Sequence, residues 1–384
     1  MPLLSNTTSG LLQRLAALAA SSLEQAHTMD PGMYTSQEVF EMEKERIFQQ
    51  QWICLGRTDA LSKAGDYLSG HIGNQPIVAI KQKDGQIAAF ANVCRHRMMT
   101  LLEGAGHCKR IVCPYHAWTY GVDGQLIAAP QMNKRPEFDR KNFSLTPIRC
   151  ETWLGWVYVT LSESLSPVAE QLKGLAKVTA PYAMENYIEI DRQEHIWDTN
   201  WKLLTENFME GYHLPVTHRA TVGAYFNTED TRFAKKPDPA FTYQTYTKTT
   251  DALVGTAHKN NKKLRGKQRV TSILPTVFPS HMFSLAPDHL WYLSLQPKGM
   301  GQVHIRYGLA IAPEVLNAAE DPEPMINEIK QFLDVVNNED RGVVEGIYRG
   351  VCSPLSTPGP LCWLERENHE FIQYLSRRLN GGYP

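Results

Sequence analysis

The chain has 384 residues, which is enough for two domains or for one large domain with an insertion. Its composition, 42% hydrophobic and 21% charged, is ordinary for a soluble globular protein, and a formal net charge of -1 gives no reason to expect nucleic acid or a membrane as partner. No apolar stretch is long enough to span a bilayer. The seven cysteines are an odd number and thinly spread, so we predict free thiols and a reducing, cytoplasmic compartment.

Helical patterns come first along the chain. Residues 11–20 are rich in Ala and Leu and predict a surface helix, and residues 37–51 have apolar side chains at helical spacing among many charges. We expect residues 1–44 to form an N-terminal helical segment that packs on the second domain.

Strand-like segments dominate the next part of the chain. Asp-Gly pairs are strong signals for tight hairpin turns, and two such pairs each lie between short apolar runs. The segments are 76–82 and 86–91 around Asp84-Gly85, 118–120 and 125–128 around Asp123-Gly124, and a final run at 154–161. We therefore predict that residues 45–160 form one compact all-β domain.

From residue 161 onward, helical and strand-like patterns are mixed. Helical patterns cover 166–187, 203–213 and 322–348, and strand patterns cover 281–286, 290–296 and 302–311. The polar, Lys- and Thr-rich span 225–270 predicts a mobile lid or loop. The fold class we expect is α+β, with an antiparallel sheet and long helices in a domain over 161–384.

One set of metal-ligand residues lies in the β-rich part. Cys94-Arg95-His96 is followed, after sixteen residues, by Cys113-Pro114-Tyr115-His116. Zinc fingers usually pair like with like, two cysteines and then two histidines. Here each loop supplies one thiolate and one imidazole, which is typical of a Rieske [2Fe–2S] centre. We interpret His107 and Cys108, which lie between the loops, as non-ligands.

A second set follows residue 200. On a helix, Glu206, Glu210 and His213 would share one face at i, i+4 and i+7. Pro215 is expected to break that helix, so that His218 approaches His213 from another backbone direction. Two histidines and one carboxylate form the facial triad of non-haem Fe(II) oxygenases.

The carboxylate of this triad must come from elsewhere in the chain. Asp340 is our candidate because the long helix predicted over 322–348 can cross the first one. On physical grounds alone Asp334, Glu339 and Glu345 compete with it.

At these residues the chain resembles the α subunits of Rieske ring-hydroxylating oxygenases, over most of its length and in the same order of motifs. The resemblance implies an all-β Rieske domain followed by a catalytic domain. It implies a [2Fe–2S] cluster and one mononuclear Fe(II). The implied cluster ligands are Cys94, His96, Cys113 and His116, and the implied iron ligands are His213, His218 and Asp340.

Glu210 departs from the commoner pattern of that family. Three residues before the first iron histidine the family usually has Asp, which links a cluster histidine of one subunit to an iron histidine of its neighbour in a head-to-tail trimer. Glu at this place, within ENFMEGYH, is similar to the branch of carnitine oxygenase, glycine betaine monooxygenase and stachydrine demethylase. Asn207 also matches a family position near the iron.

The resemblance also implies the reaction. A separate reductase would pass electrons from NAD(P)H through the cluster to Fe(II), which activates O2 for mono- or dioxygenation. The Glu branch favours a quaternary ammonium substrate, with N-demethylation or C–N cleavage. Aromatic side chains would suit such a cation. The candidates on the predicted strands are Trp291, Tyr292, Phe283 and Tyr307.

Two other functions stay open at this point. The first is hydroxylation of an aromatic ring or aromatic acid, for which Arg306 could hold a carboxylate. The second is a Rieske electron-transfer protein without catalysis, which would not need His213, His218 and Asp340.

Overall fold

The computed structural model describes residues 7–381, so the parts of our domain predictions that concern residues 1–6 and 382–384 lie outside it. The chain divides into two compact units, which we describe separately. The smaller unit is Phe48–Gln171, and the larger unit combines the residues up to Ile47 with those from Leu172 onward. We had expected the boundary at residue 160, and the compact unit extends to Gln171. Among the described residues no helix is both long and apolar enough to cross a membrane.

The smaller unit is built from two antiparallel sheets. One has seven strands in the order β1-β10-β9-β4-β3-β2-β5, and the other has three in the order β6-β7-β8. Their bounds are β1 (Ile53–Arg57), β2 (Asp66–Ile72), β3 (Gln75–Lys81), β4 (Ile87–Ala91), β5 (Ala105–His107), β6 (Ile111–Val112), β7 (Thr119–Tyr120), β8 (Leu126–Ala128), β9 (Pro147–Trp153) and β10 (Trp156–Thr160). The all-β character predicted for this part of the chain is confirmed.

Both predicted Asp-Gly hairpins are present. Asp84-Gly85 lies in the turn between β3 and β4, where Gly85 has a φ of 87°. Asp123-Gly124 lies between β7 and β8. The strand predicted from residue 154 starts only at Trp156, because Leu154 and Gly155 have positive φ and form the turn from β9.

The larger unit contains one seven-stranded antiparallel sheet in the order β11-β17-β16-β15-β14-β13-β12. The bounds are β11 (Ile188–Trp197), β12 (Arg232–Phe233), β13 (Phe241–Thr247), β14 (Thr271–Val277), β15 (His281–Leu285), β16 (His289–Gly299) and β17 (Gln302–Ile311). The three predicted strands correspond to β15, β16 and β17. The span 225–270 is not simply a loop, since it supplies β13 to the sheet.

Ten α-helices are present among residues 7–381, of which α4 alone belongs to the smaller unit. They are α1 (Thr8–Ala19), α2 (Gly32–Thr35), α3 (Gln37–Arg46), α4 (Val168–Gln171), α5 (Lys173–Thr179), α6 (Trp201–Phe208), α7 (Leu214–Thr217), α8 (Pro313–Leu316), α9 (Glu323–Val351) and α10 (Arg366–Leu379). The long helix predicted over 322–348 is α9.

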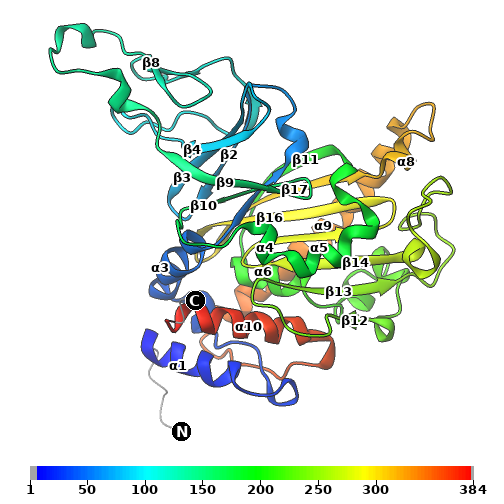
Figure 1. Cartoon of the computed structure of the whole chain (residues 1–384). Coiled ribbons are helices and arrows are strands. Elements are labelled where there is room, and N and C mark those ends of the chain that lie inside the picture. Colours follow the sequence, from blue (N-terminus) through cyan, green and yellow to red (C-terminus); the bar gives the residue numbers. More distant parts are fainter. Residues whose placement is uncertain (1–6, 382–384) are drawn as a thin grey trace. The chain divides into compact units, whose positions relative to one another are not determined.

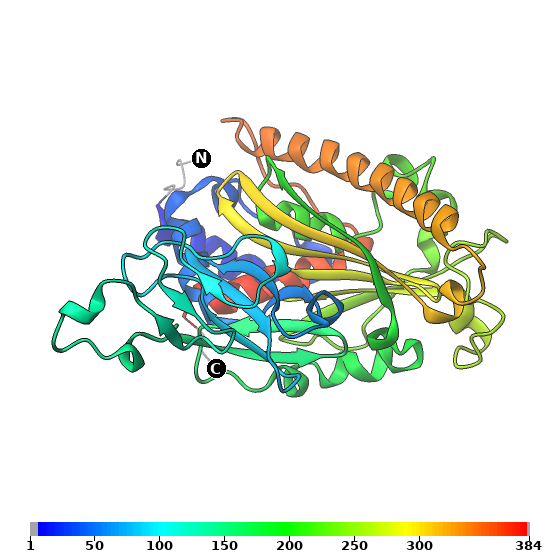
Figure 2. The ribbon, with the colours of Figure 1, turned by 90° about the horizontal axis from the view of Figure 1, so that it is seen from above.

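Amphipathic packing explains the positions of the long helices. In α9, the buried residues Leu333, Val336 and Val344 recur at helical spacing, and the helix lies along one face of the sheet (Figure 2). The predicted N-terminal helix is α1, which lies beside α10 (Figure 1) and buries Leu11 and Leu15. Both ends of the described chain therefore belong to the same unit.

Candidate metal centres and active-site cavity

Two loops of the smaller unit have the same backbone geometry. In each, the backbone N–H of the cysteine, Cys94 or Cys113, donates to the carbonyl five residues later at 2.8 Å. Each cysteine carbonyl accepts the N–H four residues later, from Met98 or Ala117, at 3.0 Å. Met98 and Ala117 both have left-handed φ, 59° and 56°, which turns the chain back on itself. The two loops thus present their side chains as a matched pair.

The four predicted cluster ligands divide into a buried pair and an exposed pair. Cys94 and Cys113 are buried, whereas His96 and His116 are exposed, with ring centroids 4.8 Å apart. The His96 ring stacks on Trp118 at 4.9 Å. The loops therefore place two sulfur atoms inside and two imidazoles at the surface.

This arrangement fits a two-iron cluster better than a single ion. Among the described residues, the one set of His, Cys, Asp or Glu side chains compact enough to hold a single metal ion is elsewhere, so the four loop residues do not form such a set. A Rieske cluster has cysteines on one iron and histidines on the other, which spreads its ligands apart. His107, interpreted as a non-ligand, bonds the Asp66 carboxylate at 2.9 Å.

The compact set is His213, His218 and Asp340, whose ligand atoms all lie within 4.8 Å of one another. His218 Nε2 is 3.0 Å from Asp340 Oδ1, and His213 Nε2 is 3.6 Å from the same oxygen. The three donors therefore converge on one point from the segment around α7 and from α9. This donor set fits a facial Fe(II) triad.

The chain reaches these positions differently from our prediction. The helix expected over 203–213 ends at Phe208, so Glu206, Glu210 and His213 do not share one helical face. Pro215 is not the breaking residue, since it lies in the first turn of α7, where proline needs no N–H partner. The chain turns instead around Gly211, where a Cβ atom would lie 2.0 Å from the Tyr246 hydroxyl oxygen.

Carboxylates orient both histidine rings. Glu210 Oε1 is 2.5 Å from His213 Nδ1, and its other oxygen accepts the His213 backbone N–H at 3.0 Å. Glu339 Oε2 is 2.7 Å from His218 Nδ1 and also accepts the Thr221 hydroxyl at 2.7 Å. With each Nδ1 engaged in this way, each Nε2 is directed toward Asp340 and is available as a metal ligand.

The competing acids have other partners. Asp334 accepts the hydroxyl of Tyr307, and Glu345 pairs with Arg341 at 2.8 Å. Glu339 orients His218, a role that we did not predict. Among these acids, Asp340 alone has a carboxylate oxygen close to the Nε2 atoms of both histidines.

A cavity of ≈ 130 Å³ adjoins the three donors. Its walls come from α6, α9, the segment after His213 and strands β11 and β13 to β16. Glu210 and Asp340 lie in its lining, and no Lys or Arg is among the lining residues, all of which lie in the described part of the chain. The aromatic lining residues are Trp197, Phe208, Tyr225, Phe226, Tyr246, Trp291 and Phe332.

Comparison with known families is decisive here. Residues 182–381 match the family model described as "Ring hydroxylating alpha subunit (catalytic domain)", and residues 51–144 match the "Rieske [2Fe-2S] domain". This chain belongs to the Rieske ring-hydroxylating oxygenase α subunits. It is a non-haem iron oxygenase with a [2Fe–2S] domain and a catalytic iron domain, in a family that receives its electrons from a reductase.

Individual relatives of this Rieske oxygenase are similar over most of its length. The carnitine monooxygenase oxygenase subunit of Acinetobacter baumannii is 35% identical over 354 residues, covering 85% of this chain and 86% of the relative. A glycine betaine monooxygenase oxygenase subunit of Pseudomonas aeruginosa is 28% identical, covering 88% and 86%. The solved quaternary ammonium Rieske monooxygenase in complex with L-carnitine has a TM-score of 0.79 at 25% identity and covers 95% of this chain and 98% of its own.

Of the four predicted aromatic residues, Trp291 alone lines the cavity of this oxygenase. Side chains alternate along a strand, so Phe283 and Tyr292 point to the opposite face of the sheet, where the Tyr292 hydroxyl donates to Glu189 at 2.7 Å. Tyr307 lies on the cavity side, but its hydroxyl donates to Asp334 and it is not part of the lining. The placement we expected for these three residues is therefore corrected.

The actual aromatic walls include residues that we had not singled out from the sequence. Phe208, at the end of α6, stacks on Trp291 with ring centroids 6.0 Å apart. Tyr225, in the span we predicted as a lid, stacks on Phe332 of α9 at 6.0 Å. Arg306, the candidate partner for an aromatic acid, is instead paired with Glu194 at 2.6 Å and lies outside the cavity.

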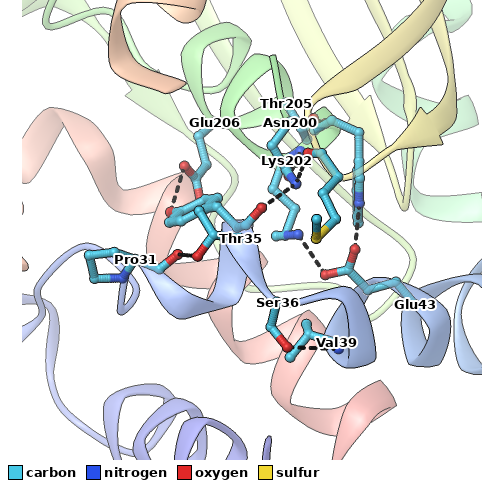
Figure 3. Close-up of polar contacts among 12 residues, drawn as sticks. Pro31, Thr35, Ser36, Val39, Glu43, Asn200, Lys202, Thr205 and Glu206 are labelled. Carbon is cyan, nitrogen blue, oxygen red and sulfur yellow. Dashed lines mark hydrogen bonds and ion pairs between the residues drawn. The ribbon is translucent and has the colours of Figure 1, made fainter. Parts of the chain in front are cut away.

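A buried polar network anchors the start of α6 (Figure 3). Glu43 accepts hydrogen bonds from Lys202 Nζ at 2.6 Å and from Trp201 Nε1 at 2.8 Å. Glu206, which we had placed beside Glu210, accepts the hydroxyl of Tyr34 at 2.9 Å. Burial raises the pKa of Glu206 from 4.5 to about 8, although Tyr34 and Lys202 act in the opposite direction. The network fixes the helix that leads into the iron site.

Proposed function

We propose that this chain is the oxygenase component that mono-oxygenates a quaternary ammonium substrate, of the betaine or carnitine kind, at an iron bound by His213, His218 and Asp340. The observation that carries the proposal is the cavity beside these donors, with seven aromatic side chains, two carboxylates and no Lys or Arg in its lining. The cluster in this proposal is held by Cys94, His96, Cys113 and His116 in the unit Phe48–Gln171.

The walls of the cavity suit a cation that cannot donate hydrogen bonds. A quaternary ammonium group has no N–H, so its stabilisation comes from aromatic faces and from nearby negative charge. Arg306, the candidate partner for an aromatic acid, is already paired with Glu194 and lies outside the cavity. The relatives named for carnitine and glycine betaine oxygenation agree with this choice.

Each group has a distinct task in the reaction. When bound, the cluster and the iron supply one-electron transfer and O2 activation. Glu210 and Glu339 fix the ring orientation of the two histidines, and the aromatic walls hold the ammonium group and exclude water from it. Oxidation of an N-methyl or N-methylene carbon beside the iron leads to N-demethylation or C–N cleavage. We place Asn207, which lines the same cavity, among the positioning residues.

We further propose a homotrimer in the cytoplasm, served by a separate reductase that draws electrons from NAD(P)H. Glu210 would then link the iron site of one subunit to the cluster of the next. Support comes from its contact with His213 and from a solved quaternary ammonium Rieske monooxygenase described as showing inter-subunit electron transfer.

Metal analysis tests the division into two sites. The wild-type chain is expected to bind three iron atoms, and His213→Ala is expected to bind two, with the Rieske EPR signal unchanged and turnover lost. His304→Ala is a matched control, because His304 also bonds a carboxylate, Glu194, but lies outside both sites. Loss of the cluster signal in His213→Ala would contradict the assignment, and a two-iron wild type would favour an electron-transfer protein.

A substrate comparison tests the reaction. With a reductase and NAD(P)H, O2 consumption is expected to be stimulated by carnitine, glycine betaine or choline and not by benzoate or naphthalene. Formaldehyde or an aldehyde formed in proportion to O2 would identify oxidation at the carbon next to nitrogen. Stimulation by the aromatic compounds alone would overturn the proposed substrate class.

A further inference from the structure

A buried histidine–aspartate pair lies in the wall of the active-site cavity, away from the iron ligands in sequence. His289, the first residue of β16, lines the cavity, and its Nδ1 is 2.8 Å from Asp288 Oδ1. The other oxygen of Asp288 accepts the backbone N–H of Gly255 at 2.9 Å. Asp288 is thus fully engaged and fixes the imidazole, and among the described residues no hydrogen bond engages His289 Nε2.

The pair can carry a positive charge on the ring. Burial alone would lower the pKa of His289, but the charge of Asp288 and its hydrogen bond outweigh this and raise the pKa. Lys248, which interacts electrostatically with Asp288, lies outside the lining, and its Nζ donates to the carbonyls of Ala252 and Val254 and to the Thr256 hydroxyl oxygen. With no Lys or Arg in the lining, His289 is the one cationic group on this wall.

An unpaired donor on the same cavity forms a second, independent observation. Trp291 Nε1 is buried and has no hydrogen-bond partner among the described residues. Trp291 lines the cavity. A buried N–H without an acceptor destabilises the folded protein, so such donors indicate an acceptor that the chain itself does not supply. Oxygen atoms of a substrate would be such acceptors.

The spacing on β16 matches a compact zwitterion. His289 and Trp291 are two residues apart on one face of the strand, which corresponds to about 7 Å. Trp291 stacks on Phe208, and both residues line the same cavity as the iron donors and His289. An ammonium group against Trp291 and Phe208 would place a carboxylate a few carbons away beside His289.

We infer that His289, held by Asp288 and assisted by the indole N–H of Trp291, binds the carboxylate of a zwitterionic quaternary ammonium substrate and determines specificity for it. The inference rests on the proposed function and deepens it. It separates betaine- and carnitine-like substrates, which have this carboxylate, from choline-like substrates, which have a neutral hydroxyl group. His289 is distinct from the residues that hold the metals and acts at the far end of the substrate.

Binding measurements on the holoprotein test this inference. Equilibrium dissociation constants are measured for L-carnitine and for choline with the wild type, His289→Gln and the control His304→Gln. We expect His289→Gln to weaken carnitine binding about tenfold or more, as for loss of a charge-assisted hydrogen bond, and to change choline binding less than about threefold. His304→Gln should leave both constants unchanged.

The ratio of the two constants separates the possible outcomes. Retained choline binding and an unchanged cluster spectrum show that the variant is folded, so a selective loss of carnitine supports the inference. Equal loss of both ligands, or loss of neither, overturns it. If the wild type itself binds no quaternary ammonium compound, the proposed function fails and not this assignment alone.

Two further variants test the same inference at other residues, so that the result does not depend on His289→Gln alone. Asp288→Asn removes the charge that holds the ring and should reproduce the selective loss of carnitine. Trp291→Phe keeps an aromatic face but removes the N–H together with part of the indole ring. Carnitine binding should weaken by a smaller factor, about three- to tenfold, and choline binding reports the effect of the smaller ring alone. An unchanged carnitine constant in both variants contradicts the assignment.

Discussion

At the scale of single residues, two carboxylates each orient one histidine of the iron site, but only one of them is proposed to take part in electron transfer. Glu210 and Glu339 each bond the Nδ1 atom of one iron-site histidine, His213 and His218 respectively. Glu339 is half-buried on α9 and bonds within its own chain to Thr221 as well. In our proposal, only Glu210 also belongs to the route between subunits.

Replacing Glu210 with Gln tests that difference. The amide oxygen can still accept the imidazole N–H, so both metals should stay bound, but the charge that couples the two centres is lost. We expect kcat to fall roughly 10- to 100-fold, as is usual when a group that orients a metal ligand is changed. The direct measurement is the rate of cluster oxidation in a single turnover with substrate and O2.

Glu339→Gln is the matched control for this experiment. It should weaken iron binding at His218 while the iron that remains is reduced at the normal rate. A wild-type rate of cluster oxidation in Glu210→Gln would remove Glu210 from the electron route.

Glu206 makes stability depend on pH in an unusual direction for a carboxyl group. Its pKa is about 8 in the folded protein and 4.5 without burial, so the folded state retains a proton that the unfolded state releases. The stabilisation is present below pH 4.5 and is lost as pH rises toward 8. Glu206→Gln should therefore exceed the wild type's free energy of unfolding only slightly near pH 5 and by several kcal/mol, at most about 5, above pH 8.

Calorimetric melting at pH 5 and pH 8.5 checks this expectation. Glu170→Gln, an exposed position on α4, serves as the control and should show no such difference between the two pH values. A pH-independent effect of Glu206→Gln would show that the carboxyl group is already ionised in the folded protein.

At the scale of elements, local patterns predicted the chain well where structure is locally determined. Asp84-Gly85 and Asp123-Gly124 predicted both hairpins, and alternation and helical spacing predicted β15 to β17 and α9. The two metal motifs were also visible, because their spacing lies within short loops. In these cases the residues that determine the element are neighbours in sequence.

The errors arise where distant segments decide the structure. The end of α6 depends on how closely Gly211 passes Tyr246 of β13, a strand that we had predicted to be part of a loop. The choice between Asp340 and Glu339 depends on how α9 is rotated about its axis relative to His218. The sequence shows two adjacent acids but does not show which of them faces the iron site. Predicting the aromatic walls requires knowing which side chains of β16 face the cavity. Alternation separates the two sets of side chains but does not say which set faces inward.

Two glycine substitutions test the importance of the turn after α6. Gly211→Ala would bring a Cβ against the Tyr246 hydroxyl and displace Glu210 and His213, so iron should be lost while the cluster signal remains. Gly342→Ala is the control, because nothing lies within 4 Å of its Cβ position in the interior of α9. That change should stabilise the protein by about 0.5–1 kcal/mol. Iron content and thermal melting distinguish the two, and full iron occupancy in Gly211→Ala would show that Tyr246 gives way.

At the scale of the whole molecule, the chain joins an electron-transfer unit and a catalytic unit in one polypeptide. If electrons pass between neighbouring subunits, two inactive chains should complement each other. Cys113→Ser lacks the cluster, and His213→Ala lacks the iron. In mixed trimers from co-expression, a quarter of the subunits combine an intact iron with a neighbour's intact cluster, so activity should recover to about a quarter of the wild-type value.

The same experiment has a clear contrary result. Transfer confined to one chain predicts no activity in any mixture, because neither chain contains both centres. Mixing the separately purified trimers without exchange of subunits controls for transfer between free molecules.

The contrast between buried cysteines and exposed histidines in the cluster loops has a consequence for how electrons are supplied. If these residues hold the cluster, His96 and His116 form its solvent-facing edge, while Cys94 and Cys113 close its inner side. In the proposed homotrimer the neighbouring subunit already covers that edge. A reductase would therefore have to deliver each electron through another face of the Rieske unit, and a large excess of reductase should not slow the enzyme.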